Sequence, residues 1–149
     1  MILRNNHIIN SISSFLIVLL FVYTGCSKLL AHQRFISQLS QIKLFTNNAV
    51  LISIALPLLE IVTGLLIIIN CTQIYGWWLA SILMTAFTCY VYAMLLYKSS
   101  LPCTCGGVIA FMTWKQHLYF NIFFMLLSWF ALCNYYKERN KIISTDIRK

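Results

Sequence analysis

The sequence has little charge, and very little of that charge is negative. Only 9% of the 149 residues are charged, with three acidic residues against eleven lysines and arginines. A soluble domain carries about 25% charged residues, so this chain is too apolar to cover a surface in water. With 60% hydrophobic residues and a mean hydropathy of +0.81, the composition excludes a soluble enzyme and a disordered chain.

The basic residues lie at the ends of apolar runs, where lysine and arginine anchor membrane helices. The net charge of +8 therefore predicts no nucleic-acid partner, and the expected partner is the lipid bilayer. Four runs are long enough to cross a bilayer, since about 20 apolar residues are needed. They are residues 8–27, 49–69, 74–97 and 118–136. The sequence predicts an all-α, four-helix integral membrane bundle, one domain over residues 1–149, with residues 137–149 as a basic tail.

The connections predict three further features. The short link at residues 70–73 makes the second and third spans an antiparallel hairpin. In residues 25–48, basic residues alternate with apolar ones, which favours an interfacial helix after the first span. Thr113 and Gln116 fit a capping box, so the last helix is expected to start at Trp114.

Four spans place both termini on one side of the membrane. That side carries six basic residues and the other side five, so the positive-inside rule predicts cytoplasmic termini. We expect a multi-pass protein of the bacterial inner membrane whose two longer connections face the oxidising outside.

Cysteines mark the first candidate site. Of the six cysteines, Cys26, Cys103 and Cys105 are expected on the outer side. Cys103 and Cys105 form a Cys-x-Cys loop before Gly106 and Gly107, between spans three and four. A disulfide between residues two apart is strained and easily reduced, which favours thiol–disulfide exchange. A fixed disulfide and a soft-metal site for Cu(I) or Zn remain alternatives.

The other cysteines carry weaker hypotheses. Cys71, Cys89 and Cys133 are expected to pack as small apolar residues. The apolar segment before Cys26 also resembles a lipoprotein signal, in which cleavage would lipidate that cysteine and remove the first helix.

Polar residues inside the spans mark a second candidate site. Glu60 is the only acidic residue within a span. It is expected to be a structural anchor or to have a proton or cofactor role. His117 is near the cysteine loop in sequence and either assists thiolate formation or lies at the interface. Inward-facing polar stripes are expected on three helices: Ser53, Pro57, Glu60 and Gly64; Ser81, Thr85, Thr88 and Tyr92; and His117, Asn121 and Ser128.

Three segments carry a family resemblance. They are Gly25-Cys26-Ser27-Lys28-Leu29, Pro57-Leu58-Leu59-Glu60 with Gly64, and Pro102-Cys103-Thr104-Cys105-Gly106-Gly107. In their order and spacing the chain resembles the methylamine utilisation MauE family of DoxX-like membrane proteins. The resemblance implies redox maturation outside the cytoplasm, in which family members help to form disulfides in a partner. Gly106 stands where an aromatic residue is common in the family, which leaves the cysteine pair intact.

The expected function is a membrane protein for thiol–disulfide exchange, an oxidoreductase if it turns over. Cys103 and Cys105 would be its redox pair, Cys26 a third thiol, and Lys28, Glu60, Gly106, Gly107 and His117 supporting residues. A thioredoxin-like domain or a secreted client is the expected partner. No metal is expected in this reading, and a quinone is the expected carrier if electrons enter the membrane. The alternatives are a non-catalytic assembly subunit and a Cu(I)- or Zn-binding membrane protein.

Overall fold

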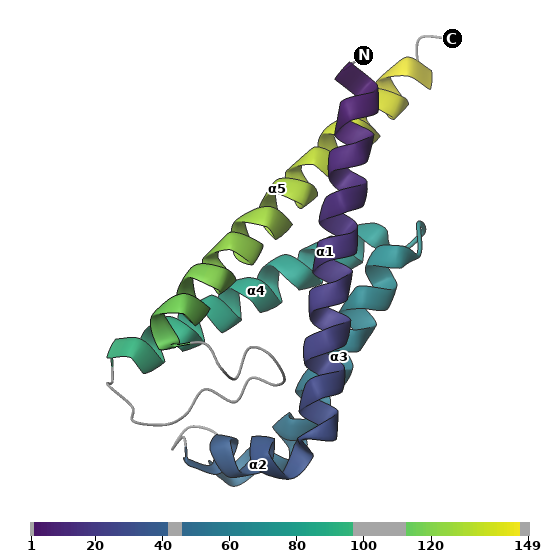
Figure 1. Cartoon of the computed structure of the whole chain (residues 1–149). Helices are drawn as coiled ribbons and strands as arrows, with labels where there is room; N and C mark the ends of the chain where they lie inside the picture. Colours follow the sequence, from purple (N-terminus) through teal and green to yellow (C-terminus); the bar gives the residue numbers. More distant parts are fainter. Residues whose placement is uncertain (1, 42–45, 97–112, 147–149) are drawn as a thin grey trace.

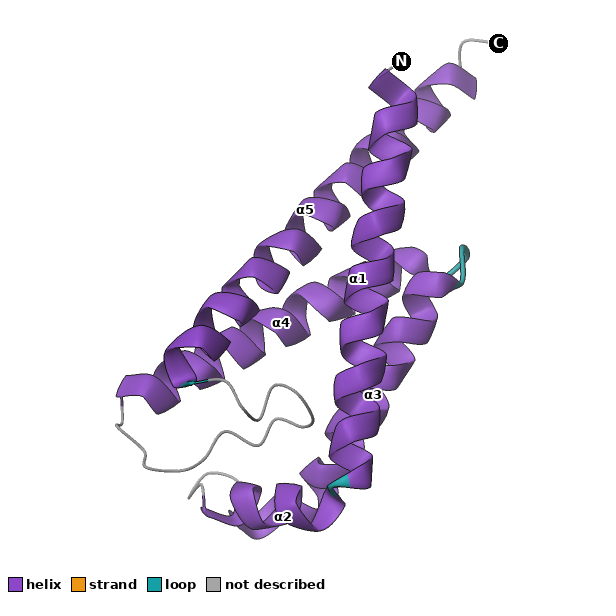
Figure 2. Ribbon diagram, viewed as in Figure 1, coloured by secondary structure: helices purple, strands orange, loops and turns teal. Residues whose placement is uncertain are grey.

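The computed structural model describes residues 2–41, 46–96 and 113–146, and within these ranges it contains helices and turns but no strand (Figures 1 and 2). In chain order the elements are α1 (Ile2–Leu30), α2 (His32–Gln41), the 3-10 helix η1 (Thr46–Asn48), α3 (Ala49–Ile68), α4 (Gln73–Leu96) and α5 (Trp114–Asp146). Among the described residues, four stretches are long and apolar enough to cross a membrane: Asn10–Leu30, Thr46–Ile68, Gln73–Leu96 and Lys115–Asn140. The all-helical prediction with four spanning helices is confirmed.

The helices pack mainly in neighbouring pairs. α1 packs along α3, α4 packs along α5, and α3 and α4 form the hairpin expected from the short link between them. Both termini lie at one end of the molecule, and α2 lies at the opposite end, packed against α3 (Figure 1). The C-terminal ends of α1 and α4 and the N-terminal end of α5 lie at that opposite end as well.

The core lies where the helix pairs meet. Its buried apolar side chains include Ile17, Phe21, Ile67, Trp77, Ala80, Met84 and Leu132. Many other large apolar side chains are exposed on the outer helix faces, as expected of surfaces that contact lipid. Since lipid tails are as apolar as leucine, burial alone does not hold such helices together, and close packing and polar contacts decide which faces meet.

The two ends of α5 can be compared with the boundaries that the sequence predicts. Thr113 and Gln116 form the expected capping box, in which the Thr113 N–H donates to Gln116 Oε1 at 2.9 Å and the Gln116 N–H donates to Thr113 Oγ1 at 3.4 Å. α5 accordingly starts at Trp114. It continues to Asp146, so much of the segment expected as a basic tail is a helical extension of the last span.

The polar stripes are largely where the helical spacing predicts them. All four members of the stripe on α3 are buried, and so are His117, Asn121 and Ser128 on α5. Tyr92 is the exception, because it is 52% exposed on α4. The prediction for Tyr92 was wrong although the spacing holds. Tyr92 is eleven residues, or about three turns, after Ser81, but its side chain is not covered near the C-terminal end of α4.

Candidate functional site

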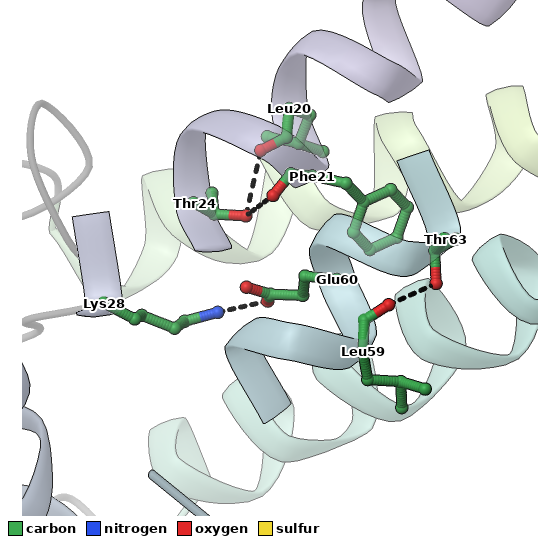
Figure 3. Close-up of polar contacts among 7 residues, drawn as sticks. All are labelled: Leu20, Phe21, Thr24, Lys28, Leu59, Glu60 and Thr63. Atoms are coloured by element: carbon green, nitrogen blue, oxygen red, sulfur yellow. Dashed lines mark hydrogen bonds and ion pairs between the residues drawn. The ribbon is translucent and has the colours of Figure 1, made fainter. Parts of the chain in front are cut away.

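Lys28 and Glu60 form a buried ion pair between α1 and α3. The Lys28 ammonium donates a hydrogen bond to Glu60 Oε1 (Figure 3). Glu60 is 0% exposed and Lys28 is 7% exposed. A charge is costly to bury alone, and removing one partner of such a pair leaves the other uncompensated. The two residues therefore depend on each other for their place in the bundle.

A close approach of the two helix backbones brings the pair together. A Cβ atom added to Gly25 would lie 3.0 Å from the Pro57 carbonyl oxygen and 2.9 Å from Ile61 Cγ1. Gly25 is three residues before Lys28, and Pro57 is three residues before Glu60, so each pair shares one helix face. The glycine thus removes the spacing that a side chain would impose, and the lysine reaches across to the carboxylate.

Two aromatic rings from other helices complete the surroundings of the ammonium. Lys28 Nζ lies 4.9 Å from the ring centroid of Phe87 on α4 and 5.9 Å from that of Phe35 on α2. Both distances are within the range of cation–π attraction. One lysine of α1 therefore contacts α2, α3 and α4, so the pair lies at the point where four helices come together.

The second carboxylate oxygen of Glu60 is buried but has no hydrogen-bond partner in the described part of the chain. Nearby hydroxyls are directed to their own helices. The Thr24 hydroxyl donates to Leu20 O at 2.9 Å and Phe21 O at 3.3 Å, and the Thr63 hydroxyl donates to Leu59 O at 2.7 Å (Figure 3). A hydroxyl has one proton to donate. The Thr24 hydroxyl also lies close enough to interact with the Glu60 carboxylate, but Oε2 itself has no hydrogen-bond partner among the described residues.

The cysteine site lies mostly outside the described residues. Cys103, Cys105, Gly106 and Gly107 fall in the segment between α4 and α5 that the structure does not describe. Cys26 is described and is an exposed, free thiol. It precedes Lys28 by two positions, which is roughly 200° around the helix, so the cysteine faces outward while the lysine faces Glu60. The structure joins Lys28 to Glu60 and not to Cys26.

Other sequence predictions are corrected or refined. Cys71, Cys89 and Cys133 are free and exposed, so the prediction that they pack inside the protein was wrong. Cys71 lies in the turn before α4, and the other two lie on outer helix faces. His117 is buried in the first turn of α5.

Sequence reasoning missed the partner of Glu60 and both phenylalanines. An available signal was that a lone acid within a span needs a cation, and that Lys28 ends the first apolar run. No sequence signal distinguished Phe35 and Phe87 from the other phenylalanines.

Fold and site together define a four-helix integral membrane protein whose helices meet at a buried ion pair. The family model described as "Methylamine utilisation protein MauE" matches residues 6–134. The chain belongs to the MauE family, and the match includes Lys28, Glu60 and the Cys-x-Cys segment. No significant match is found among curated proteins or among solved structures.

Proposed function

We propose that this MauE-family protein carries out thiol–disulfide exchange with a partner outside the cytoplasm. In the oxidising direction, a partner thiolate attacks the Cys103–Cys105 disulfide and forms a mixed disulfide. The second partner thiolate then attacks that bond and releases Cys103 and Cys105 as thiols. Two electrons and two protons pass from the partner to the cysteine pair, and the partner gains one disulfide. A thioredoxin-like domain or a secreted client is the proposed partner.

One observation supports this proposal above the others. The C-terminal ends of α1 and α4 and the N-terminal end of α5 lie at the same end of the molecule (Figure 1). Cys26 belongs to the end of α1, and the chain between α4 and α5 contains Cys103 and Cys105. The topology thus favours an arrangement in which all three thiols serve one face of the membrane.

The same end carries features of a membrane surface. α2 exposes Gln33, Arg34, Ser37 and Ser40, while Leu39 is buried and the helix packs against α3. A helix with one polar and one apolar face is suited to lie at the membrane–water boundary. We propose that α2 lies on the outer surface of a bacterial inner membrane, with both termini in the cytoplasm.

Serine substitution in the full-length protein tests this function. In cells that make Cys105→Ser, the lone Cys103 thiolate is expected to attack the disulfide of the oxidised partner, which is the reverse of the step above. The mixed disulfide should then accumulate because Cys105 is not there to resolve it, while Cys103→Ser is expected to abolish exchange. Cys89→Ser serves as the matched control, since Cys89 is an exposed thiol on α4. Non-reducing electrophoresis with mass spectrometry identifies the adduct. Wild-type client oxidation in both loop variants would refute the proposal and favour a non-catalytic assembly subunit.

Labelling of intact cells tests the orientation. An impermeant maleimide is expected to modify Cys103 and Cys105 after reduction but not before it. Labelling that requires permeabilised cells would place the pair on the cytoplasmic side and contradict the proposed topology.

A further inference from the structure

Glu60 Oε2 is a hydrogen-bond acceptor that the described fold leaves unused. An unsatisfied buried polar group costs about 1–3 kcal/mol, and native proteins pair nearly all such groups with protein or ordered water. The other oxygen of the same carboxylate is held by Lys28, so Oε2 has a fixed position. A fixed free acceptor is suited to receive a hydrogen-bond donor from a ligand.

The surroundings indicate what kind of ligand fits. An ammonium has three N–H donors, and one of those on Lys28 is used by Glu60. The rings of Phe87 and Phe35 lie beside the same ammonium, at 4.9 Å and 5.9 Å. Donors, an acceptor and two aromatic rings thus come together at one place. They match a planar ring with oxygen substituents: in the quinone a carbonyl would accept from Lys28, and in the quinol a hydroxyl would donate to Glu60.

Access also restricts the ligand. Glu60 belongs to a membrane-spanning helix and is 0% exposed. The Gly25 side of the pair is closed by the tight contacts with α3. Phe35 and Phe87 are only partly buried, so among these four residues the two rings are the part that reaches the surface of the molecule. A molecule that arrives there has to be soluble in the bilayer.

We propose that Lys28, Glu60, Phe35 and Phe87 bind the headgroup of a lipid-soluble quinone or quinol. The inference rests on the proposed function, because it names the electron acceptor for the cysteine pair. Oxidation of the Cys103 and Cys105 thiols to a disulfide releases two electrons and two protons. Reduction of a quinone to a quinol takes up the same two electrons and two protons, so the overall exchange balances.

Photolabelling of the full-length protein in lipid nanodiscs tests the site. A short-chain benzoquinone that carries an azide is the probe, and the unmodified short-chain quinone is the competitor. We expect saturable labelling of peptides that contain Phe35 or Phe87. Phe87→Leu is expected to weaken binding by about tenfold, since it removes an aromatic wall. Phe130→Leu is the matched control, because Phe130 is an exposed phenylalanine of α5, and it should bind as the wild type does.

Glu60→Gln is expected to abolish saturable labelling, and Phe87→Leu keeps the test valid if that variant does not fold. Labelling that is not saturable and spreads over all lipid-facing helices would overturn the inference, and so would equal binding by the Phe87 and Phe130 variants. The infrared band of the Glu60 carboxylate reports its hydrogen bonding. If this band shows only water as the partner and does not change when quinone is added, the inference is overturned as well. If quinone binding fails while Cys105→Ser traps a client, the quinone site is wrong and the exchange function stands. If quinone binds at the site but Cys105→Ser traps no client, the exchange function is wrong and the quinone-binding site stands.

Discussion

The two main helix pairs are held together by different means. In the α1–α3 pair, glycines bring the backbones close, since a Cβ on Gly64 would lie 3.1 Å from Val22 Cγ2, and a buried ion pair crosses the interface. In the α4–α5 pair, Trp78 and Trp129 meet edge to face with centroids 6.0 Å apart. There the Trp78 indole N–H donates to the Tyr136 hydroxyl at 3.0 Å, on an exposed face.

This difference shows where the bundle depends on single residues. Helices in lipid gain little from apolar contact alone, so close packing and polar contacts set their pairing. The polar groups of the α1–α3 pair are enclosed, and the loss of one leaves the other without a partner. The aromatic groups of the α4–α5 pair are exposed and numerous, so each contact contributes less. Three groups of substitutions, from the largest expected effect to the smallest, test that contrast.

Removing one member of the ion pair should have the largest effect. Glu60→Gln and Lys28→Met are each expected to lower the free energy of unfolding by about 3–5 kcal/mol, because each leaves a buried group uncompensated. The double variant that combines Glu60→Gln with Lys28→Met should recover most of this loss, since neither charge remains. Unfolding in mixed detergent micelles, followed by circular dichroism, measures all three. Additive losses in the double variant would show that the two residues are not coupled.

Widening the α1–α3 contact should have an intermediate effect. Gly25→Ala adds a Cβ that would lie 2.9 Å from Ile61 Cγ1 and 3.0 Å from the Pro57 carbonyl oxygen, so the helices have to separate. Overpacking of this kind costs about 1–3 kcal/mol. The matched control is Ala55→Val, because Ala55 is exposed on α3. The same unfolding assay applies, and equal stability of the two variants would contradict a close approach at Gly25.

Loss of one aromatic hydrogen bond on the α4–α5 face should have the smallest effect. Trp78→Phe removes the indole donor to Tyr136, and interhelical hydrogen bonds in membrane proteins contribute about 0.6 kcal/mol on average. Tyr136→Phe removes the same bond from the other side and keeps the contact between Trp78 and Trp129, so its loss should be no larger than that of Trp78→Phe. A loss as large as that of Glu60→Gln would remove the distinction between the two helix pairs.

Local sequence was sufficient for much of the fold. Four long apolar runs determine four spanning helices, because a backbone in lipid has to satisfy its hydrogen bonds within each segment. The capping box at Thr113 determined where α5 starts, since its two hydrogen bonds join residues three apart. Helical spacing also predicted the buried face of α3 that contains Glu60. Cys71, Cys89 and Cys133 were expected to pack as small apolar residues but are exposed, because small apolar residues suit lipid and the protein interior equally well.

Tertiary structure alone decided what Glu60 meets. Lys28 is 32 residues away along the chain, and local spacing gives no relation between them. The crossing of α1 and α3 at Gly25 joins them, and the positions of α2 and α4 add Phe35 and Phe87. Sequence periodicity fixes which face of a helix is polar. Which helix covers that face depends on backbone contacts between distant segments, and these contacts are made only when the bundle assembles.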